Sequence, residues 1–356
     1  MPKLRLLFLS TPVGPLGSGQ GGGVELSLQN IAQEMKRRGH KILVVAPSES
    51  VLQDVPVKEI AGNLQIPAQT QERNVPICLP ENAVLGNMWE YARQCQAEYD
   101  LIVNFAFDWL PFYLTPFFRI PIAHFISMGS LSDALDVAMK QVAIAYPETI
   151  GVYTKSQAET FPFAEFCRCL GSGLDLSLYD FCETPQRQLA WLGRIAPEKA
   201  LEDAVEASQR TGIPLKIFGK IQDEDYWQKI CQEYPDAPIE YRGFLSTTAL
   251  QEQLRGCQAL VMTPRWVEAF GNVAIEALAC GVPVISYNRG GPAEIVRDGK
   301  SGFLVEPDSV TGLVDAIERI SEIDRRACRQ QAEDEYSLTA LGDRFEAWFR
   351  DILLGE

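Results

Sequence analysis

The stretch "WVEAFGNVAIEALACG", from Trp266 to Gly281, is the most informative part of the sequence. Its second half is nearly all apolar and predicts a buried helix, yet it carries Glu276, eight residues after Glu268. A charged carboxylate is not buried without a partner. The two acids therefore either pair with nearby cations or bind a ligand that donates hydrogen bonds.

Strand-like runs alternate with helical runs on both sides of this stretch, which is typical of parallel α/β sheets. Residues 48–80 predict loops with short strands, and residues 337–354 predict an amphipathic helix with Leu341, Phe345, Trp348 and Ile352 at helical spacing. Two series of strands predict two Rossmann-like domains facing one another, with a hinge near residues 171–181. The expected strands are 4–10, 41–47, 101–105, 121–126 and 150–154, then 189–193, 215–219, 239–244, 259–263 and 282–286.

Composition narrows the classes of partner. The chain has 356 residues, is 46% hydrophobic and has a formal charge of −15. Residues 1–170 carry 13 basic and 16 acidic side chains, and residues 171–356 carry 19 and 31. Neither half is basic, which disfavours nucleic acid and anionic membranes as partners.

Cysteine usage and the first residues predict a cytoplasmic location. The nine cysteines are scattered without a C-x-x-C, which fits neither a zinc site nor a disulfide framework and favours a reducing compartment. The apolar run in "MPKLRLLFLS" is too short for a signal peptide or membrane span and reads as a first strand.

A glycine-rich loop, "TPVGPLGSGQGGGVE", follows the first strand and opens a helix. Glycines allow backbone N–H groups to approach a phosphate or sugar. A P-loop would need Gly-Lys-Ser/Thr before the helix, and a dinucleotide fingerprint would need an acid closing the second strand; neither is present. The remaining interpretations are a loop that contacts a donor substrate and a flexible surface turn. The loop's glycines are Gly14, Gly17, Gly19, Gly21, Gly22 and Gly23.

Two cations follow a strand of the second series. Arg194 and Lys199, in "WLGRIAPEKA", lie just beyond its carboxyl end, where ligands bind in open α/β sheets. A diphosphate suits such a pair, because Arg binds it with a planar fork and Lys as a point charge. The alternative is a solvated loop with a Glu198–Lys199 neighbour pair.

The opening stretch adds carboxylates to these cations. Residues 270–273, "FGNV", open a helix whose first N–H groups have no helical partner. Glu268 lies in the preceding loop and Glu276 about one turn into the helix, so both can face the same crevice. We expect Glu276 to accept hydrogen bonds from a ribose and Glu268 from the hydroxyls of a transferred hexose. The alternative for either acid is a buried ion pair with an Arg or Lys.

These motifs resemble the retaining glycosyltransferases of family 4, which have the GT-B fold. "EAFGNVAIE" is similar to the family's E-x-F-G-x-x-x-x-E, "LGRIAPEKA" to its G-R-x-x-x-x-K, "GSGLD" to its N-G-x-D and "GGGVE" to its G-G-x-E. The resemblance covers almost the whole chain. Its departures are Ser172 in place of Asn, Ala200 in place of Gly, and Ser127 at the end of a strand where members often carry a His. His124, three residues earlier, is expected to be a core residue and receives no catalytic role.

The resemblance implies which residues bind each part of the nucleotide sugar and which domain binds each substrate. It implies that Arg194 and Lys199 bind the diphosphate of a nucleotide sugar and Glu276 its ribose, with Gly22 and Gly23 also at the donor site. Glu268 and the backbone of Phe270, Gly271, Asn272 and Val273 would bind the sugar. The C-terminal helix would cross back, giving an acceptor-binding domain of residues 1–170 plus 337–356 and a nucleotide-sugar-binding domain of residues 171–336.

A narrower resemblance is to the UDP-glucose:tetrahydrobiopterin glucosyltransferases, carried by "FLSTPVGPLGSGQGGGVELSL", "NFAFDWLPFYLTPFF" and "HFISMGSLSD". It implies UDP-glucose as donor and the side-chain hydroxyl of a reduced pterin as acceptor. Aromatic residues of the first domain either stack the pterin ring or pack in the core. They are Phe105, Phe107, Trp109, Phe112 and Phe125.

The chemistry implied is transfer with retention by front-face displacement, in which the departing diphosphate accepts the acceptor's proton. Such a reaction needs positioning and electrostatic stabilisation, with Arg194, Lys199 and Glu268 as the catalytic residues. The sequence has no D-x-D on a strand end, so we expect no metal and no cofactor. Transfer to other acceptors, including lipids, remains an alternative. Three other classes of protein also remain: a sugar-nucleotide epimerase of the same fold, a dehydrogenase and a non-catalytic nucleotide-binding module.

Overall fold

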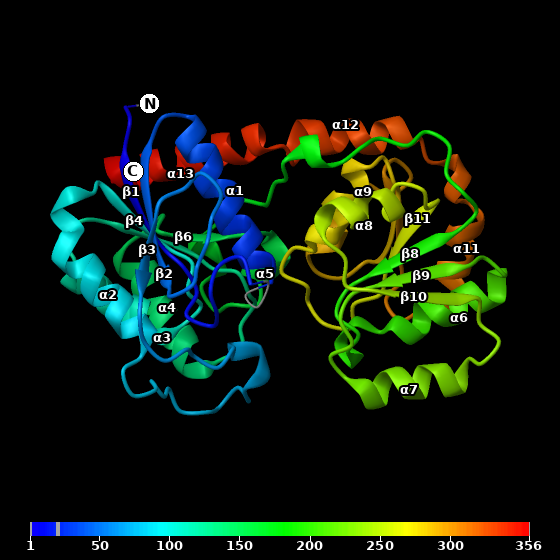
Figure 1. Ribbon diagram of the computed structural model, residues 1–356, viewed down its shortest axis with the longest axis horizontal. Coiled ribbons are helices and arrows are strands. Elements are labelled where there is room, and N and C mark those ends of the chain that lie inside the picture. The colour runs from blue at the N-terminus through cyan, green and yellow to red at the C-terminus, as the bar shows by residue number, and fades with distance from the viewer. Residues whose placement is uncertain (1, 19–21, 356) are drawn as a thin grey trace. The chain divides into compact units, whose positions relative to one another are not determined.

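The chain divides into two units in the computed structural model, which describes residues 2–18 and 22–355. Unit 1 comprises Met1–Ser172 and Leu338–Glu356, and unit 2 comprises Gly173–Ser337. Each unit has its own parallel sheet, one of seven strands and one of six, with helices around it (Figure 1). The expected α/β fold with two Rossmann-like domains is confirmed.

Unit 1 is built on a sheet of order β3-β2-β1-β4-β5-β6-β7. Its central strands are almost continuously apolar because helices cover both faces, as parallel sheets require. The strands are β1 Arg5–Leu9, β2 Lys41–Pro47, β3 Val57–Ile60, β4 Leu101–Asn104, β5 Ile122–Phe125, β6 Ile150–Val152 and β7 Cys167–Cys169. The α-helices are α1 Gly23–Arg37, α2 Val84–Cys95, α3 Trp109–Leu114, α4 Asp133–Ala145, α5 Lys155–Ala158 and α13 Leu338–Leu354.

The C-terminal helix α13 belongs to unit 1 and packs against α1. Its apolar face is buried, and the ring of Phe345 lies 5.3 Å from that of Phe125 in β5. Trp348 donates its indole N–H to the Glu148 carbonyl at 2.6 Å. At the other edge of the helix, Arg38 pairs with Glu346 at 2.6 Å. The chain therefore returns to the unit in which it began.

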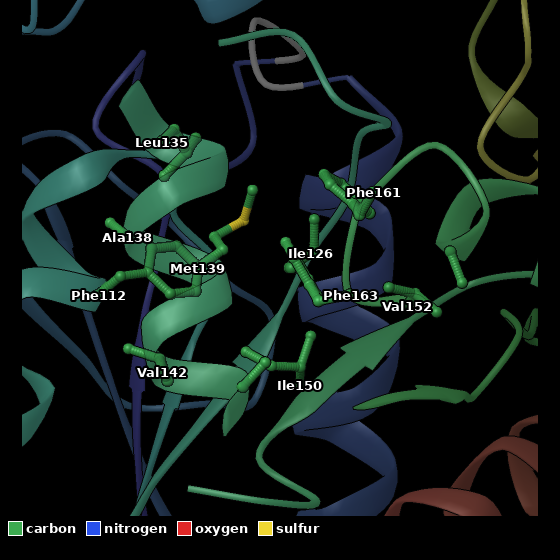
Figure 2. Packing of buried hydrophobic residues seen from close by; sticks show 12 residues of the cluster. Phe112, Ile126, Leu135, Ala138, Met139, Val142, Ile150, Val152, Phe161 and Phe163 are labelled. Carbon is green, nitrogen blue, oxygen red and sulfur yellow. The ribbon is translucent and has the colours of Figure 1, made fainter. Parts of the chain in front are cut away.

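A core cluster of unit 1 lies between α4 and the ends of β5 and β6 (Figure 2). Met139 and Val142 of α4 pack against Ile126 and Ile150, and Phe112 joins them from α3. Three partly buried aromatic residues also pack against the cluster, namely Phe107, Trp109 and Phe166. This core supports the carboxyl ends of the strands, where the chain loops out.

Unit 2 repeats the plan with the strand order β10-β9-β8-β11-β12-β13. Helices α6 and α11 pack together against this sheet, and α9 packs against the sheet and against α12 (Figure 1). The strands are β8 Leu189–Leu192, β9 Leu215–Phe218, β10 Ile239–Gly243, β11 Ala259–Met262, β12 Val284–Tyr287 and β13 Gly302–Val305. The α-helices are α6 Leu201–Thr211, α7 Glu224–Glu233, α8 Thr247–Leu254, α9 Asn272–Ala279, α10 Gly291–Ile295, α11 Val310–Glu318 and α12 Arg325–Glu335.

Both sheets contain a point where the direction of winding reverses. In unit 1 it lies between β1 and β4, and in unit 2 between β8 and β11. Ligands of open α/β sheets bind outside the carboxyl ends of the strands at such a point, because the two connections diverge there and leave a crevice. The loops after β1 and β4, and those after β8 and β11, are therefore the places to look for a site.

Candidate active site

The reversal point of unit 2 carries most of the residues that the sequence singles out. Arg194 follows β8, and Lys199 closes the short 3-10 helix Pro197–Lys199 that leads into α6. Glu268 lies in the loop after β11, and that loop ends at α9. Since β8 and β11 are paired, both loops leave the same part of the sheet edge.

Lys199, Glu268 and Trp266 form a closed cluster at this edge. The ammonium of Lys199 bonds the Glu268 carboxylate, and the indole N–H of Trp266 donates to the same oxygen, Oε2, at 3.0 Å. The ammonium also lies 5.0 Å from the centre of the Trp266 ring, within the range of a cation–π contact. Both charged side chains remain 18% exposed, so a ligand can reach them. The ion pair weighed as an alternative for Glu268 is thus present.

Buried Thr263 fixes the backbone that carries Lys199. Its hydroxyl lies 2.9 Å from the Lys199 carbonyl and 2.8 Å from the Ala200 carbonyl, and its oxygen accepts the Trp191 indole N–H at 3.2 Å. Ala200, where the family resemblance leads us to expect Gly, has φ 45°. That left-handed conformation is the one glycine adopts without steric cost, which explains the family's preference.

Arg194 is held outside this cluster. One end of its guanidinium donates to Glu198 at 2.9 Å and the other to Gln222. Its side chain is 36% exposed, and an exposed pair of this kind contributes little to stability, so an anionic ligand can displace Glu198 at little cost. The expected Glu198–Lys199 neighbour pair does not form, because Glu198 turns to Arg194 and Lys199 turns to Glu268.

Three glycines bring the loop of Glu268 close to the start of α10. A Cβ on Gly290 would lie 2.7 Å from the Glu268 nitrogen, and one on Gly291 would lie 2.4 Å from the Phe270 carbonyl oxygen. The Gly291 N–H donates to the Glu268 carbonyl at 2.7 Å. Gly271, with φ 93°, turns the chain into α9. Phe270 is buried and anchors the loop.

Helix α9 begins at Asn272 without a side-chain cap, so no capping side chain occupies its first N–H groups, and the Ala274 N–H donates to the Gly271 carbonyl at 2.9 Å. Asn272 and Val273 are only partly buried. The amide oxygen of Asn272 is buried and has no hydrogen-bond partner within the described chain. The start of α9 is therefore polar and accessible, as an anion or hydroxyl site at a helix N-terminus requires.

Glu276 has a different environment from Glu268. Its carboxylate accepts a hydrogen bond from the Tyr179 hydroxyl at 3.1 Å, and no hydrogen bond joins it to Arg194, Lys199 or Glu268 in the described structure. Burial among apolar neighbours raises its pKa to about 7, while the Tyr179 bond acts in the opposite direction. An acid held near neutrality without a cation is unusual and indicates a functional position.

Gly22 and Gly23 lie in unit 1, unlike the other candidate residues. Gly22, with φ 63°, precedes the first turn of α1, and Gly23 is its first residue. Gly19 and Gly21 lie outside the described residues.

The other sequence candidates of unit 1 separate into core and surface. His124 is fully buried, bonded to Asn104 and Thr115, and its pKa is lowered to about 3 by burial, so it is a neutral core residue. Phe105, Phe112 and Phe125 are also core residues, whereas Phe107 and Trp109 reach a cavity. The Ser127 hydroxyl lines that cavity and is buried without a partner within the described chain.

Two further structural findings bear on the class of site. Among the described residues, no group of three or more His, Cys, Asp or Glu side chains is arranged to hold a metal ion. No helix of the described chain is long and apolar enough to span a membrane.

The sequence alone did not point to Thr263, Trp266 or Tyr179. Tyr179 is 97 positions from Glu276, and no local pattern links them. Trp266 lies two positions before Glu268, and an aromatic residue so close to a loop acid is a sequence signal that could have located it. Thr263, a polar residue directly after the apolar strand "ALVM", was a second one.

The family model of the group 1 glycosyl transferases matches residues 183–335. A glycogen synthase of Mycobacterium tuberculosis (strain CDC 1551 / Oshkosh) is 29% identical over 179 residues, 48% of this chain and 43% of its own. The match therefore spans less than half the length of that relative. A D-inositol 3-phosphate glycosyltransferase of Corynebacterium glutamicum (strain R) is 23% identical over 99% of this chain and 98% of its own.

Solved structures share the fold over nearly the whole chain. Anabaena Alr3699/HepE, solved in complex with UDP and glucose, is 18% identical, with a TM-score of 0.77 over 98% of this chain and 100% of its own. The sucrose-phosphate synthase of Thermosynechococcus elongatus is 17% identical, with a TM-score of 0.80 over 99% of this chain and 100% of its own. Residues 183–335 therefore match the group 1 glycosyl transferase family model, and the chain as a whole has the GT-B fold.

Proposed function

We propose that the chain transfers glucose from UDP-glucose, with retention at the anomeric carbon, to the side-chain hydroxyl of a small acceptor, a reduced pterin such as tetrahydrobiopterin. The observation that carries the proposal is the grouping of cations and carboxylates around the reversal point of unit 2. Cations there suit a diphosphate, and carboxylates suit the hydroxyls of sugars. UDP-glucose as donor is also supported by HepE, which was solved with UDP and glucose.

In this proposal, Arg194 and Lys199 bind the diphosphate and stabilise it as it leaves. The diphosphate draws Lys199 away from Glu268, and the freed carboxylate binds the glucose hydroxyls. Trp266 continues to donate to Glu268 and keeps it in place. The Lys199–Glu268 ion pair thus holds both groups ready, because neither is left buried and unpaired before the donor binds.

The remaining donor contacts come from α9 and from unit 1. The N–H groups of residues 270–273 face the sugar, and the Glu276 carboxylate accepts hydrogen bonds from the two ribose hydroxyls. Gly22 and Gly23 would approach the donor with their backbone. The acceptor hydroxyl attacks the anomeric carbon from the face that the diphosphate leaves, and its proton passes to a departing phosphate oxygen. Positioning and charge stabilisation supply the catalysis, and no residue forms a covalent bond.

The experiment is transfer with purified full-length protein. UDP-glucose is incubated with tetrahydrobiopterin, with D-inositol 3-phosphate and with no acceptor, and products are identified by mass and their anomeric configuration by NMR. We expect a hexose adduct of the pterin with the α configuration of the donor. A β-linked product would refute retention, transfer to the inositol phosphate alone would refute the pterin, and an isomerised UDP-sugar without acceptor would indicate an epimerase.

A further inference from the structure

Unit 1 contains a cavity of about 300 Å³ at its own reversal point, lined only by residues of that unit. Thr11 enters it from the loop after β1, Phe107 to Trp109 from the loop after β4, and Ser127 from the end of β5. Segment 64–80 forms the opposite wall. This size and position are typical of a site for one small molecule.

A desolvated carboxylate lies in the cavity wall. Asp108 caps helix α3, accepting the Leu110 N–H at 3.4 Å, and its other oxygen accepts the Gln65 side-chain N–H at 2.9 Å. Burial raises the pKa of this carboxyl. An ionised carboxylate offers about four lone-pair positions, so Asp108 can accept further N–H or O–H groups from a ligand.

Two hydroxyls on the same cavity have no partner. Thr11 is 7% exposed, and its Oγ1 is buried without a hydrogen bond within the described chain. The same holds for the Oγ of Ser127. Buried polar groups in native proteins are nearly always satisfied, by protein, water or ligand. Two such hydroxyls, in residues that line the same cavity as Asp108, therefore point to a polar ligand.

The charge of the lining excludes one class of acceptor. Among the described residues, the lining contains Asp108 and Glu72 and no Lys, Arg or His. A phosphate group would have no cation to pair with and two carboxylates nearby, so an inositol phosphate does not suit this cavity. An uncharged molecule rich in N–H donors does.

The flat shape of the ligand follows from the aromatic residues. Phe107 and Trp109 line the cavity and pack from behind against the core cluster of Figure 2, so their rings are held in place. Trp109 is further stacked on Tyr113, with ring centres 4.5 Å apart. Four exposed apolar residues of segment 64–80, Leu64, Ile66, Ile77 and Leu79, would be covered by a bound ring or by closure of the segment over it.

Resting on the glycosyl transfer proposed above, we propose that this cavity is the acceptor site and that it selects a planar, phosphate-free heterocycle with adjacent N–H donors. Asp108 accepts the N–H groups of the ring's amino edge, and the hydroxyls of Thr11 and Ser127 bind its carbonyl oxygen or ring nitrogens. A pterin has such an amino edge, because its 2-amino group stands beside a ring N–H. Asp108 is then the residue that determines acceptor specificity.

The first test is a fluorescence titration of the full chain with biopterin, without donor. Asp108→Asn keeps an oxygen for the cap of α3 and presents its NH2 group to Gln65, whose side-chain amide can turn so that its oxygen accepts. The variant is therefore expected to fold, and to bind biopterin about 10- to 100-fold more weakly. Thr11→Val is expected to weaken binding about 2- to 10-fold and to raise the melting temperature, since it removes an unpaired hydroxyl. The control Glu90→Gln, an exposed carboxylate of α2, should leave biopterin affinity unchanged.

Exposed Cys78 lines the cavity and supplies a second readout that needs no variant. Saturating biopterin should slow alkylation of Cys78 by iodoacetamide several-fold and leave Cys169, an exposed cysteine of β7, unaffected; D-inositol 3-phosphate should protect neither. Unchanged biopterin affinity in Asp108→Asn, or protection of Cys78 by the inositol phosphate but not by biopterin, would overturn the proposal. If Asp108→Asn does not fold, Cys78 protection decides.

UDP is titrated into the same samples to separate the two proposals. If UDP binds and glucose is transferred while biopterin neither protects Cys78 nor depends on Asp108, the acceptor site is wrong and the glycosyl transfer stands. If UDP fails to bind the wild-type chain, the proposed function itself is refuted.

Discussion

Replacing Glu276 tests the donor site most sharply. Because the pKa of this carboxyl is raised, the substitution Glu276→Gln is expected to lower activity and, at pH 8, to raise the melting temperature. Within the described residues the carboxylate has one hydrogen-bond partner, the Tyr179 hydroxyl, and we propose that it also accepts hydrogen bonds from two ribose hydroxyls. Charge-assisted hydrogen bonds contribute about 1.5–3 kcal/mol each. Losing two in Glu276→Ala should lower kcat/KM for UDP-glucose by about 10²- to 10⁴-fold.

Glu276→Gln removes the charge of the side chain and keeps its shape. The amide keeps an oxygen for Tyr179 and replaces charged by neutral hydrogen bonds, which differ by about 1–1.5 kcal/mol each. The expected loss in kcat/KM is therefore about 10- to 100-fold, smaller than for alanine. The matched control is Glu318→Gln, an exposed carboxylate at the end of α11, with no expected effect.

The pH dependence follows from the raised pKa of about 7. Below pH 7 the wild-type carboxyl becomes protonated and loses acceptor capacity, so the KM for UDP-glucose should rise by up to about tenfold per pH unit, whereas Glu276→Gln should show no such rise. Stability changes in the opposite sense. A carboxyl whose folded pKa is raised stabilises the fold below its unfolded pKa of about 4.5 and loses that contribution as the pH rises through 7. Glu276→Gln should therefore melt higher than wild type at pH 8 and not at pH 4.

Steady-state kinetics between pH 5.5 and 8.5, with melting curves on the same samples, measures both effects. Wild-type kinetics in Glu276→Ala would refute the ribose role. A melting temperature of Glu276→Gln that is lowered equally at all pH values would show that the carboxylate is structural, and the reasoning from its desolvation would fail.

Three further substitutions probe the site and the fold. Glu268→Gln should lower kcat by about 10- to 100-fold with little change in UDP affinity, because the proposed contact of Glu268 is with the sugar and not with the nucleotide. Wild-type transfer rates in this variant would refute a role for Glu268 in the site. Thr263→Val loses the hydroxyl that bonds the Lys199 and Ala200 carbonyls, so it should lower the free energy of unfolding by about 1–3 kcal/mol in urea titrations and raise the KM for UDP-glucose. An unchanged KM would show that Lys199 needs no such support. Glu49→Gly, at an exposed position with φ 68°, should stabilise the chain by about 0.5–1 kcal/mol, and a loss of stability would contradict the cost assigned to that conformation.

The sequence predicted the fold well because its signals are local. Apolar runs bounded by turn residues located the central strands of both sheets, and the helical spacing from Leu341 to Ile352 located α13. The strands β7 and β13 were not predicted. Each lies at the edge of its sheet, is three or four residues long, and is stabilised by pairing with a neighbour that the sequence does not name.

The candidate site was harder to predict because its contacts are non-local. Motif spacing located Arg194, Lys199, Glu268 and Glu276 on loops at the carboxyl ends of strands. It did not show that Lys199 pairs with Glu268 across 69 positions, nor that Glu276 has a tyrosine and no cation as its partner. Such pairings depend on how the loops after β8 and β11 pack against each other, and many sequence patterns produce the same residues with other partners.

The most direct test of the whole account is a crystal structure of the full chain with UDP-glucose. The account predicts the diphosphate on Arg194 and Lys199, the Lys199–Glu268 pair opened, and Glu276 on the ribose hydroxyls. A nucleotide bound elsewhere, with Lys199 still on Glu268 and Glu276 touching only Tyr179, would contradict it.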